Sequence, residues 1–388
     1  MAKFKFEDLL YIKGRIGWQA LSKNEYLKKG SYYLVTGIDI QNNNLINWDK
    51  CYFVSKERYE QDEKIQLKIG DIILTKDGTI GKIGYIDKLE KPATLNSHLF
   101  LIRNKREDIL NTRYLFWLLQ SNLFLKYTEG NSTGSNILGF TQKSIYNFEI
   151  ELPDIKTQNN IANILDNINT QILRNNTMIQ KLQDMILTRY SIMFQDKTNK
   201  NGLLKDICLL PSGYNFKPEI YNNYGEYKLI TIKNVWDTFI DDINTDKISD
   251  VPSIKDYCYL RIGDILLSLT GNVGRISIVH SKNNLLNQRV SLLQAKENYK
   301  IYSYCLLKSQ EYQFIMTNIA RGTSQKNLSP IDVENLKIYV PTLEEIKVFN
   351  EKTENYFNEM LTIKQSTDKL IILKEKLLPL LINGQLNI

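Results

Sequence analysis

An internal repeat constrains this chain more than any other feature of its sequence. Residues 69–83 match residues 262–276, and a cation, Lys82 or Arg275, follows the last glycine of each segment. Other segments match in the same order, namely 34–40 with 229–235, 134–135 with 322–323, and 148–153 with 336–341. The landmarks that recur 193 positions later are Gly70, Asp71, Gly78 and Gly81, which become Gly263, Asp264, Gly271 and Gly274. Self-similarity of this kind indicates a duplicated structural unit, so we expect two copies of one globular unit.

Each copy is followed by a segment with helical periodicity. Apolar residues alternate at steps of four and three, the pattern of a coiled-coil seam. In the first segment the seam residues are Ile161, Leu165, Ile168, Ile172, Ile179, Leu182, Ile186 and Met193, with Asn175 and Arg189 at the remaining positions. In the second they are Phe349, Thr353, Tyr356, Met360, Ile363, Thr367, Leu370, Lys374, Leu377 and Leu381.

The two helices are expected to pair with each other. A helix of about 40 residues would be about 60 Å long, longer than one face of a domain of about 150 residues. Because a globular unit lies between the helices, we predict an antiparallel coiled coil within the chain. The alternative is that each helix packs on its own domain. Asn175 either fixes the register of the seam, as a buried polar residue can, or is exposed.

Within each copy the pattern is mixed and strand-rich, which predicts an α+β fold. Short apolar runs bounded by turn residues indicate strands, and helices are expected at residues 112–121 and 301–309. We divide the chain into a first globular domain at 1–153, a helix at 154–200, a second domain at 201–341 and a helix at 342–388.

Composition excludes several classes of protein. The chain has 388 residues, with 50 Lys and Arg against 43 Asp and Glu, a net charge of +7. It has no apolar run of the roughly 18 residues that a membrane span needs, and the charged residues near Met1 do not resemble a signal peptide. We therefore expect a cytoplasmic protein. The four cysteines are widely scattered, which favours buried thiols over a zinc site or disulfides.

Motifs for catalysis are absent from the sequence. It has no phosphate-binding P-loop and no G-x-G-x-x-G dinucleotide motif, and neither of the two histidines, His98 and His280, stands in a triad pattern. Asp71 and Asp264 follow glycine, which favours a turn-forming role over that of a general base. The sequence predicts no catalytic residues and no metal ligands.

Two loops in each copy are candidates for ligand contact. The first, 77–82 and 270–275, is glycine-rich: it is a hairpin that needs positive φ, and its free N–H groups and cation could also contact phosphate. The second, 130–136 and 321–327, carries small polar residues that suit base edges or phosphates, although a solvated surface loop has the same composition. Arg289 is added because residues 287–289 align with the polar triplet 96–98. The candidate residues are Lys76, Thr79, Lys82, Ser135, Asn136, Lys143, Asn272, Arg275, Arg289, Arg321, Thr323, Gln325 and Lys326.

The repeat, the two glycine loops and the strand-Pro-helix sequel together resemble a known family. Over essentially its full length, the chain resembles the specificity subunit of a type I restriction–modification system, with two target recognition domains and two spacer helices. Residues 14–18 and 33–39 are also typical of the first recognition domain in such subunits.

The resemblance implies a non-catalytic subunit that binds double-stranded DNA. Each recognition domain would read one half of a bipartite target, and the helices would act as a ruler between the halves. The partners implied are two methyltransferase subunits, which hold S-adenosylmethionine, and restriction subunits driven by ATP and Mg²⁺; no cofactor is expected in this chain. A modification-only complex differs only in its partners. A DNA-independent coiled-coil scaffold and a catalytic protein are the alternatives from other classes.

Overall fold

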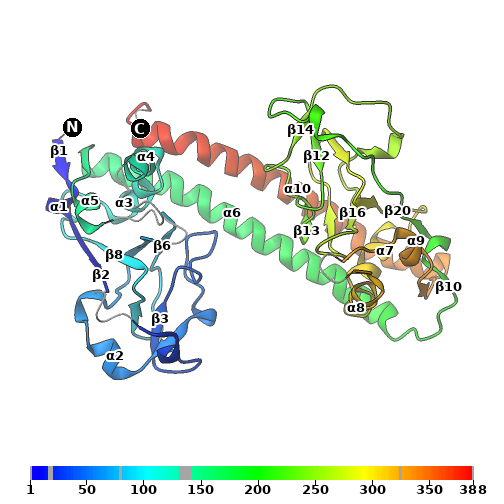
Figure 1. Cartoon of the computed structure of the whole chain (residues 1–388), viewed down its shortest axis with the longest axis horizontal. Coiled ribbons are helices and arrows are strands. Elements are labelled where there is room, and N and C mark those ends of the chain that lie inside the picture. The colour runs from blue at the N-terminus through cyan, green and yellow to red at the C-terminus, as the bar shows by residue number, and fades with distance from the viewer. Residues whose placement is uncertain (1, 16–20, 78–80, 131–140, 323–325, 387–388) are drawn as a thin grey trace. The chain divides into compact units, whose positions relative to one another are not determined.

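The chain forms two compact units that divide in the middle of both long helices. The computed structural model describes residues 2–15, 21–77, 81–130, 141–322 and 326–386 (Figure 1). Unit 1 comprises residues 1–173 and 370–388, and unit 2 comprises residues 174–369. Helix α6 spans Ile155–Tyr190 and α10 spans Leu343–Ile382, so each unit contains one copy of the repeat and a part of both helices.

Unit 1 is built from short strands and helices around a core of buried aliphatic and aromatic side chains. Its strands form three sheets, ordered β1-β9, β2-β8-β5-β6 and β4-β3-β7. The strands are β1 (Ala2–Lys5), β2 (Leu10–Gly14), β3 (Tyr32–Val35), β4 (Tyr52–Val54), β5 (Ile72–Thr75), β6 (Ile83–Tyr85), β7 (Ala93–Leu95), β8 (Leu99–Asn104) and β9 (Glu149–Leu152). The helices are α1 (Phe6–Leu9), α2 (Lys56–Glu60), α3 (Thr112–Leu119), α4 (Asn122–Gly130) and α5 (Gln142–Tyr146).

Unit 2 repeats this plan with the sheets β10-β21, β11-β20, β13-β17-β16-β19 and β14-β12-β18-β15. Its strands are β10 (Gly202–Leu203), β11 (Cys208–Leu209), β12 (Tyr227–Ile230), β13 (Thr238–Phe239), β14 (Lys247–Ile248), β15 (Tyr259–Leu260), β16 (Ile265–Ser268), β17 (Ile276–Ile278), β18 (Asn284–Leu286), β19 (Val290–Leu292), β20 (Gln294–Ala295) and β21 (Lys337–Ile338). The helices are α7 (Lys300–Lys308), α8 (Gln310–Ile319) and α9 (Pro330–Glu334). After α6, a π-helical turn spans Ser191–Gln195.

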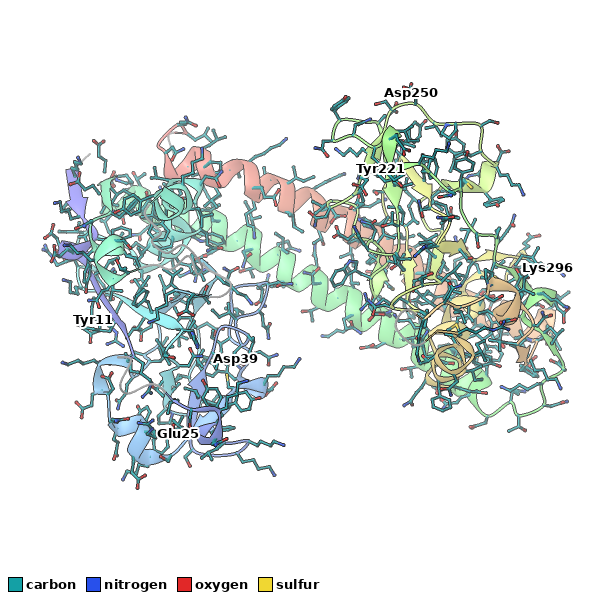
Figure 2. The ribbon with its side chains drawn as sticks, in the orientation of Figure 1. Tyr11, Glu25, Asp39, Tyr221, Asp250 and Lys296 are labelled. Atoms are coloured by element: carbon teal, nitrogen blue, oxygen red, sulfur yellow. The ribbon has the colours of Figure 1, made fainter. Side chains whose placement is uncertain are left out.

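The two units share pairing patterns as well as sequence. The parallel pair β3·β7 in unit 1 corresponds to the parallel pair β12·β18 in unit 2. After β3, Asp39 (labelled in Figure 2) accepts hydrogen bonds from the backbone N–H and the hydroxyl of Thr36, at 2.8 and 2.7 Å. After β12, Asn234 accepts the same pair of bonds from Thr231, at 3.0 and 2.9 Å. The predicted duplication and the predicted α+β class are confirmed.

Within each unit, α6 and α10 pack against each other in antiparallel directions. In unit 2, Asn175 donates to Thr367 Oγ1 at 3.0 Å. Beyond the end of α6, Lys197 pairs with Glu345 near the start of α10. From Asn175 to Lys197 the residue numbers rise, whereas those of their partners fall from Thr367 to Glu345, so the two segments run in opposite directions. In unit 1, Lys374 donates to Asn169 at 3.1 Å, and the start of α6 shares a core with Leu381 near the end of α10. The predicted antiparallel pairing is confirmed, and Asn175 bonds across the seam.

Both helices also pack on the globular parts, so the alternative arrangement is partly present. In unit 1, Asp166 on α6 accepts a hydrogen bond from the indole Nε1 of Trp117 on α3, at 2.8 Å. In unit 2, the buried Gln183 on α6 donates to the hydroxyl of Tyr304 on α7, at 2.7 Å. Each helix therefore buries one side against its partner helix and another against the domain beside it.

The cysteines bear out one further sequence prediction. All four cysteines are buried free thiols. Among the described residues, no group of three or more His, Cys, Asp and Glu side chains is arranged to hold a metal ion. No described helix combines the length and the apolar character that crossing a membrane requires.

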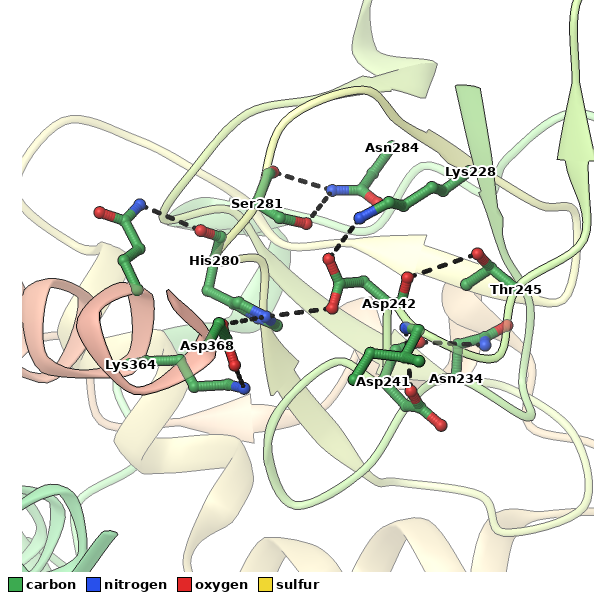
Figure 3. A network of polar contacts seen from close by, with 12 residues as sticks. Lys228, Asn234, Asp241, Asp242, Thr245, His280, Ser281, Asn284, Lys364 and Asp368 are labelled. Carbon is green, nitrogen blue, oxygen red and sulfur yellow. Dashed lines mark hydrogen bonds and ion pairs between the residues drawn. The ribbon is translucent and has the colours of Figure 1, made fainter. Parts of the chain in front are cut away.

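A buried ionic network in unit 2 ties its globular part to α10 (Figure 3). His280 follows β17 and is 1% exposed, and its Nε2 lies 3.3 Å from Oδ1 of Asp242 and 3.1 Å from Oδ2 of Asp368 on α10. Lys228 pairs with Asp242 at 2.6 Å, and Lys364 pairs with Asp368 at 2.5 Å. Burial lowers the pKa of His280, but the two carboxylates raise the pKa by more, so its net value lies above the ordinary one.

We expect the stability of unit 2 to depend on pH through His280. Because its pKa is raised in the folded state, His280 contributes its full stabilisation below its ordinary pKa of about 6.5. That contribution is lost as the pH rises through the raised value. His280→Asn should therefore lower the thermal midpoint most near pH 6 and progressively less toward pH 9, corresponding to about 2 kcal/mol at the lower pH.

Melting curves of the wild type and the variant across this pH range would measure the difference. His98→Asn is the matched control, because the side chain of His98 is 63% exposed and its pair with Asp77 is open to solvent. Exposed pairs of this kind contribute little to stability. An equal loss of stability for His280→Asn at both ends of the range would contradict a role for its charge.

Candidate nucleic-acid interface

The glycine loop is held by the same hydrogen bonds in both units. In unit 1, the N–H of Gly81 donates to the carbonyl of Thr75 at 3.1 Å, and the N–H of Lys82 donates to the Thr75 hydroxyl at 2.8 Å. In unit 2, the N–H groups of Gly274 and Arg275 bond in the same way to Ser268, both at 3.0 Å. The chain reverses at Gly81 (φ +83°) and Gly274 (φ +82°), a left-handed conformation that favours glycine. The hairpin that the sequence predicts is confirmed, and it presents a cation directly after the turn.

The strands that lead into the glycine loops, β5 and β16, are each preceded by a turn that an aspartate holds by a hydrogen bond. Asp71 accepts a hydrogen bond from the N–H of Lys68 at 2.6 Å, and Asp264 accepts one from the N–H of Arg261 at 2.7 Å. Arg103 also pairs with Asp71 at 2.6 Å. Both aspartates are therefore turn-forming residues, as the sequence indicates, and their carboxylates are occupied by structural bonds.

In unit 2, the two candidate loops lie side by side. The N–H of Gly271 donates to the carbonyl of Lys326 at 3.1 Å, and the hydroxyl of Thr270 donates to Oδ1 of Asn327 at 3.0 Å. The backbones of Arg321 and Asn327 exchange hydrogen bonds at 2.8 and 2.7 Å. Two segments that are distant in the sequence therefore form one surface, which we call the paired-loop surface (residues 270–275, 321–322 and 326–327).

A hollow of about 590 Å³ lies beside the paired-loop surface. The exposed Arg289 stands at this hollow, and its carbonyl accepts a hydrogen bond from the N–H of Leu269 at 3.1 Å. The other lining residues are mostly hydroxyl and amide side chains that could donate and accept hydrogen bonds: Ser212, Thr270, Gln288, Asn327 and Ser329, with Leu269, Leu328 and Pro330. Within the described part of the chain, no ion pair engages the guanidinium of Arg289.

Two further cations of this surface, Arg321 and Lys326, are held by exposed contacts. Arg321 is 84% exposed and pairs with Asp332 at 3.3 Å. Lys326 donates to the carbonyl of Thr317 at 3.1 Å. Exposed pairs are weak, so both side chains can exchange their present partners for a phosphate. Thr323 and Gln325, the other candidates in this loop, lie outside the described residues.

In unit 1, Lys76 and Lys82 flank the glycine loop. The N–H of Lys76 donates to the carbonyl of His98 at 3.0 Å, and its Nζ lies 5.3 Å from the centre of the Phe100 ring. Lys82 follows the turn at the start of β6. Lys143 lies on α5, exposed, and no contact between described residues joins it to the loop. Thr79, Ser135 and Asn136 lie outside the described residues.

One residue of the interface was missed by sequence reasoning. His98 occupies in unit 1 the place of Arg289 in unit 2, because the bond from Lys76 to the His98 carbonyl repeats the bond from Leu269 to the Arg289 carbonyl. His98 is exposed, and its Nδ1 lies 2.5 Å from Oδ1 of Asp77 in the glycine loop. The alignment of the triplets 96–98 and 287–289 contains the signal for this residue.

Known proteins are similar to this chain over most of its length. A model of the type I restriction modification DNA specificity domain matches residues 1–184 and again residues 197–371. The specificity subunit of the type I restriction enzyme MjaVIII from Methanocaldococcus jannaschii is 26% identical over 361 residues, covering 84% of this chain and 81% of that protein. The putative MjaX specificity subunit of the same organism is 23% identical over 393 residues, covering 92% and 88%.

A solved structure shares the fold. The crystal structure of the type I restriction–modification S subunit from M. genitalium superposes with a TM-score of 0.61 at 15% identity, covering 98% of this chain and 96% of that chain. The family model matches nearly the whole chain in two copies, and the copies coincide with the two halves of the internal repeat. The chain therefore belongs to the family of type I restriction–modification DNA specificity subunits.

Proposed function

We propose that this chain recognises a bipartite double-stranded DNA target and directs partner methyltransferase subunits to it. Unit 1 reads one half of the target and unit 2 reads the other. The observation that carries the proposal is the recurrence, bond for bond, of the glycine loop and its cation in two compact units. Two copies of one recognition element in a single chain suit a target with two parts.

The chemistry of the paired-loop surface supports contact with DNA. Arginine can form two parallel hydrogen bonds with guanine, and amide side chains can do so with adenine. Cations and backbone N–H groups bind phosphates and so position the protein on the duplex. With a net charge of only +7 over 388 residues, binding depends on where the cations lie rather than on bulk charge.

The helices α6 and α10 are proposed to set the spacing between the two half-sites. Each helix runs continuously from one unit into the other, through residues 173–174 and 369–370. Their antiparallel pairing fixes the register within each unit, at Asn169 and Lys374 in unit 1 and at Asn175 and Thr367 in unit 2. A continuous helix has a fixed rise per residue, so its length can determine a distance along DNA.

The chemistry of modification and cleavage is assigned to partner subunits. Two methyltransferase subunits would hold S-adenosylmethionine, and restriction subunits would use ATP and Mg²⁺. A modification-only complex is the second candidate, and it requires the same recognition surface. The isolated chain is proposed to have neither methyltransferase nor nuclease activity. Activity in the isolated chain would instead support the alternative of a catalytic protein. Binding of specific DNA by the assembled complex separates the proposed function from that of a coiled-coil scaffold.

Exchange of one recognition domain should change one half of the target. Replacing residues 1–153 with the corresponding segment of a relative of different specificity should alter only the half-site read by unit 1. Methylation mapping in cells that carry the chimera and the methyltransferase partner would show the new motif. A change in both half-sites would contradict independent reading by the two units.

Lengthening both helices together should change the spacer. We propose inserting one heptad after Leu173 and one after Lys369, so that both pairs of register contacts are kept within their units. Each heptad adds about 10.5 Å, or about three base-pair steps of ~3.4 Å, so the spacer should change or specific methylation should be lost. A heptad added to α6 alone is the matched control, which should disrupt the register. An unchanged spacer in the double insertion would exclude the ruler.

Arg289 should contribute to affinity for one half-site. Arg289→Ala is expected to weaken specific binding by the assembled complex about 10- to 100-fold, the effect of losing one good base contact. Lys296→Ala (labelled in Figure 2) removes an exposed cation of unit 2 outside the paired-loop surface and should leave the affinity within about twofold. Fluorescence anisotropy with the same DNA would measure the affinity of both variant complexes. An equal loss of affinity in the two variants would indicate that Arg289 acts through its charge alone and not through a base contact.

A further inference from the structure

Unit 2 exposes a tryptophan in a fixed orientation beside the glycine loop. This tryptophan does not line the hollow at which Arg289 lies. Trp236 lies in the loop between β12 and β13 and is 54% exposed. Its Nε1 donates to the carbonyl of Lys233 at 3.0 Å, which holds the indole in place. The only polar atom of the ring is thus occupied within the protein, and the exposed ring face is available for apolar contact or stacking.

The tryptophan belongs to a cluster of three side chains from two loops. The guanidinium of Arg275, from the glycine loop, lies 5.7 Å from the centre of the Trp236 ring. With its amide oriented so that both groups are satisfied, Asn272 accepts hydrogen bonds from Nη1 and Nη2 of Arg275, at 3.2 and 3.3 Å. These contacts orient the guanidinium without neutralising its charge. We call Trp236, Asn272 and Arg275 the Trp236 cluster.

The loop that carries Trp236 is anchored to α6 through a strained residue. Thr238 has φ +73°, a left-handed conformation that is costly for a β-branched side chain. Its hydroxyl donates to Oε1 of Gln183 on α6 at 2.9 Å, and Nε2 of Gln183 donates to the hydroxyl of Tyr304 at 2.7 Å. Gln183 is 2% exposed, and both the oxygen and the nitrogen of its amide are bonded within the protein. Strain of this kind persists where the surrounding structure fixes it, and it is frequent at functional sites.

Arg275 is anchored from a second direction. The side chain of Gln313 on α8 donates to the carbonyl of Gly274 at 2.8 Å and to the carbonyl of Leu307 at 2.7 Å. The hydroxyl of Ser277 on β17 donates to the carbonyl of Trp236. Both loops of the cluster are thus fixed by side chains of the surrounding elements, which is the preorganisation that specific recognition requires.

The surroundings of the cluster favour DNA over an apolar ligand. A hollow of about 420 Å³ lies between the glycine loop and α6, and its lining includes Gln180, Gln183, Asp237, Arg275, Lys308 and Gln313. The three amides and two cations outnumber the apolar Leu187 and Ile276, and the carboxylate of Asp237 pairs with Lys308 at 3.5 Å. Arg275 also belongs to the same loop as Thr270, which lines the hollow of Arg289, so the two hollows flank one loop. A duplex seated on the paired-loop surface could therefore extend over the Trp236 cluster.

We propose that the Trp236 cluster is a second base-reading element of unit 2, and that Gln183 is the residue that positions it. Arg275 contacts base edges of the half-site that unit 2 reads, and the indole of Trp236 packs against a sugar or a thymine methyl group. Gln183 does not touch DNA; it keeps the strained Thr238 turn, and with it Trp236, in place. This inference rests on the proposed function, since it assumes that unit 2 reads DNA.

The test uses the complete complex of this chain with its methyltransferase partner and a library of targets substituted at each base pair of both half-sites. Arg275→Ala and Trp236→Ala should reduce discrimination about tenfold or more at one or two positions in the unit 2 half-site. Discrimination in the other half-site should be unchanged. Gln183→Leu should relax the same positions, and Thr188→Val, later on α6, exposed and outside the lining of the hollow, should relax none.

Folding and partner binding are measured for every variant by thermal melting and by the stoichiometry of the purified complex. Unchanged discrimination in Arg275→Ala and Trp236→Ala complexes that assemble normally would overturn the proposal. Loss of the methyltransferase partner in these surface variants would also overturn it, because the cluster would then be a protein-docking surface. If the wild-type complex showed no bipartite target, the proposed function itself would fail. If Arg289→Ala altered the half-site and the cluster variants did not, only the present inference would fail.

Discussion

The structure depends on burying the apolar seams of two helices, α6 and α10, that are separated in the sequence by a whole globular domain. Neither copy of the repeat completes its core alone. In unit 1, Ile161 and Leu165 of α6 share a core with Leu381 and Ile382 from the end of the chain, and in unit 2, residues of α6 from Ile179 to Ile186 share one with the first half of α10. Polar contacts across the seam, such as Asn175 to Thr367, add register to the apolar packing. Because of this packing, each helix belongs to both units. This is why we propose that the length of the helices sets the distance between the two half-sites.

The repeat and the helix pairing could be predicted from sequence because each has a local chemical signature. Glycine at positions 81 and 274 marks backbone turns that other residues rarely adopt, and heptads mark a helix face that needs a partner. The functional surface has weaker signatures. Thr238 adopts a left-handed conformation without being glycine, so nothing in the sequence points to the turn that holds Trp236. His280 meets Asp242 and Asp368 only through tertiary packing, and residues this far apart leave no periodic pattern.

The proposed recognition surface depends on where its cations lie rather than on charge density. The cations that flank the glycine loops are few, and several of them, including Arg275 and Lys326, are oriented by neighbouring amides or carbonyls. Weak exposed contacts allow some side chains to exchange partners, whereas buried bonds such as those of Gln183 keep the loops that carry them in place. Such a surface suits a protein that distinguishes sequences, because preorganised donors lose more when a base is wrong than flexible ones do.

We propose that the two units read two separate half-sites at a fixed distance. Methylome sequencing of a host that carries this chain with its methyltransferase partner, against the same host without the chain, measures this directly. If the two units read two half-sites at a fixed distance, we expect one methylated motif made of two defined half-sites. A spacer of constant length and arbitrary sequence should separate them. A single continuous motif, a spacer of variable length, or methylation that does not depend on the chain would contradict it.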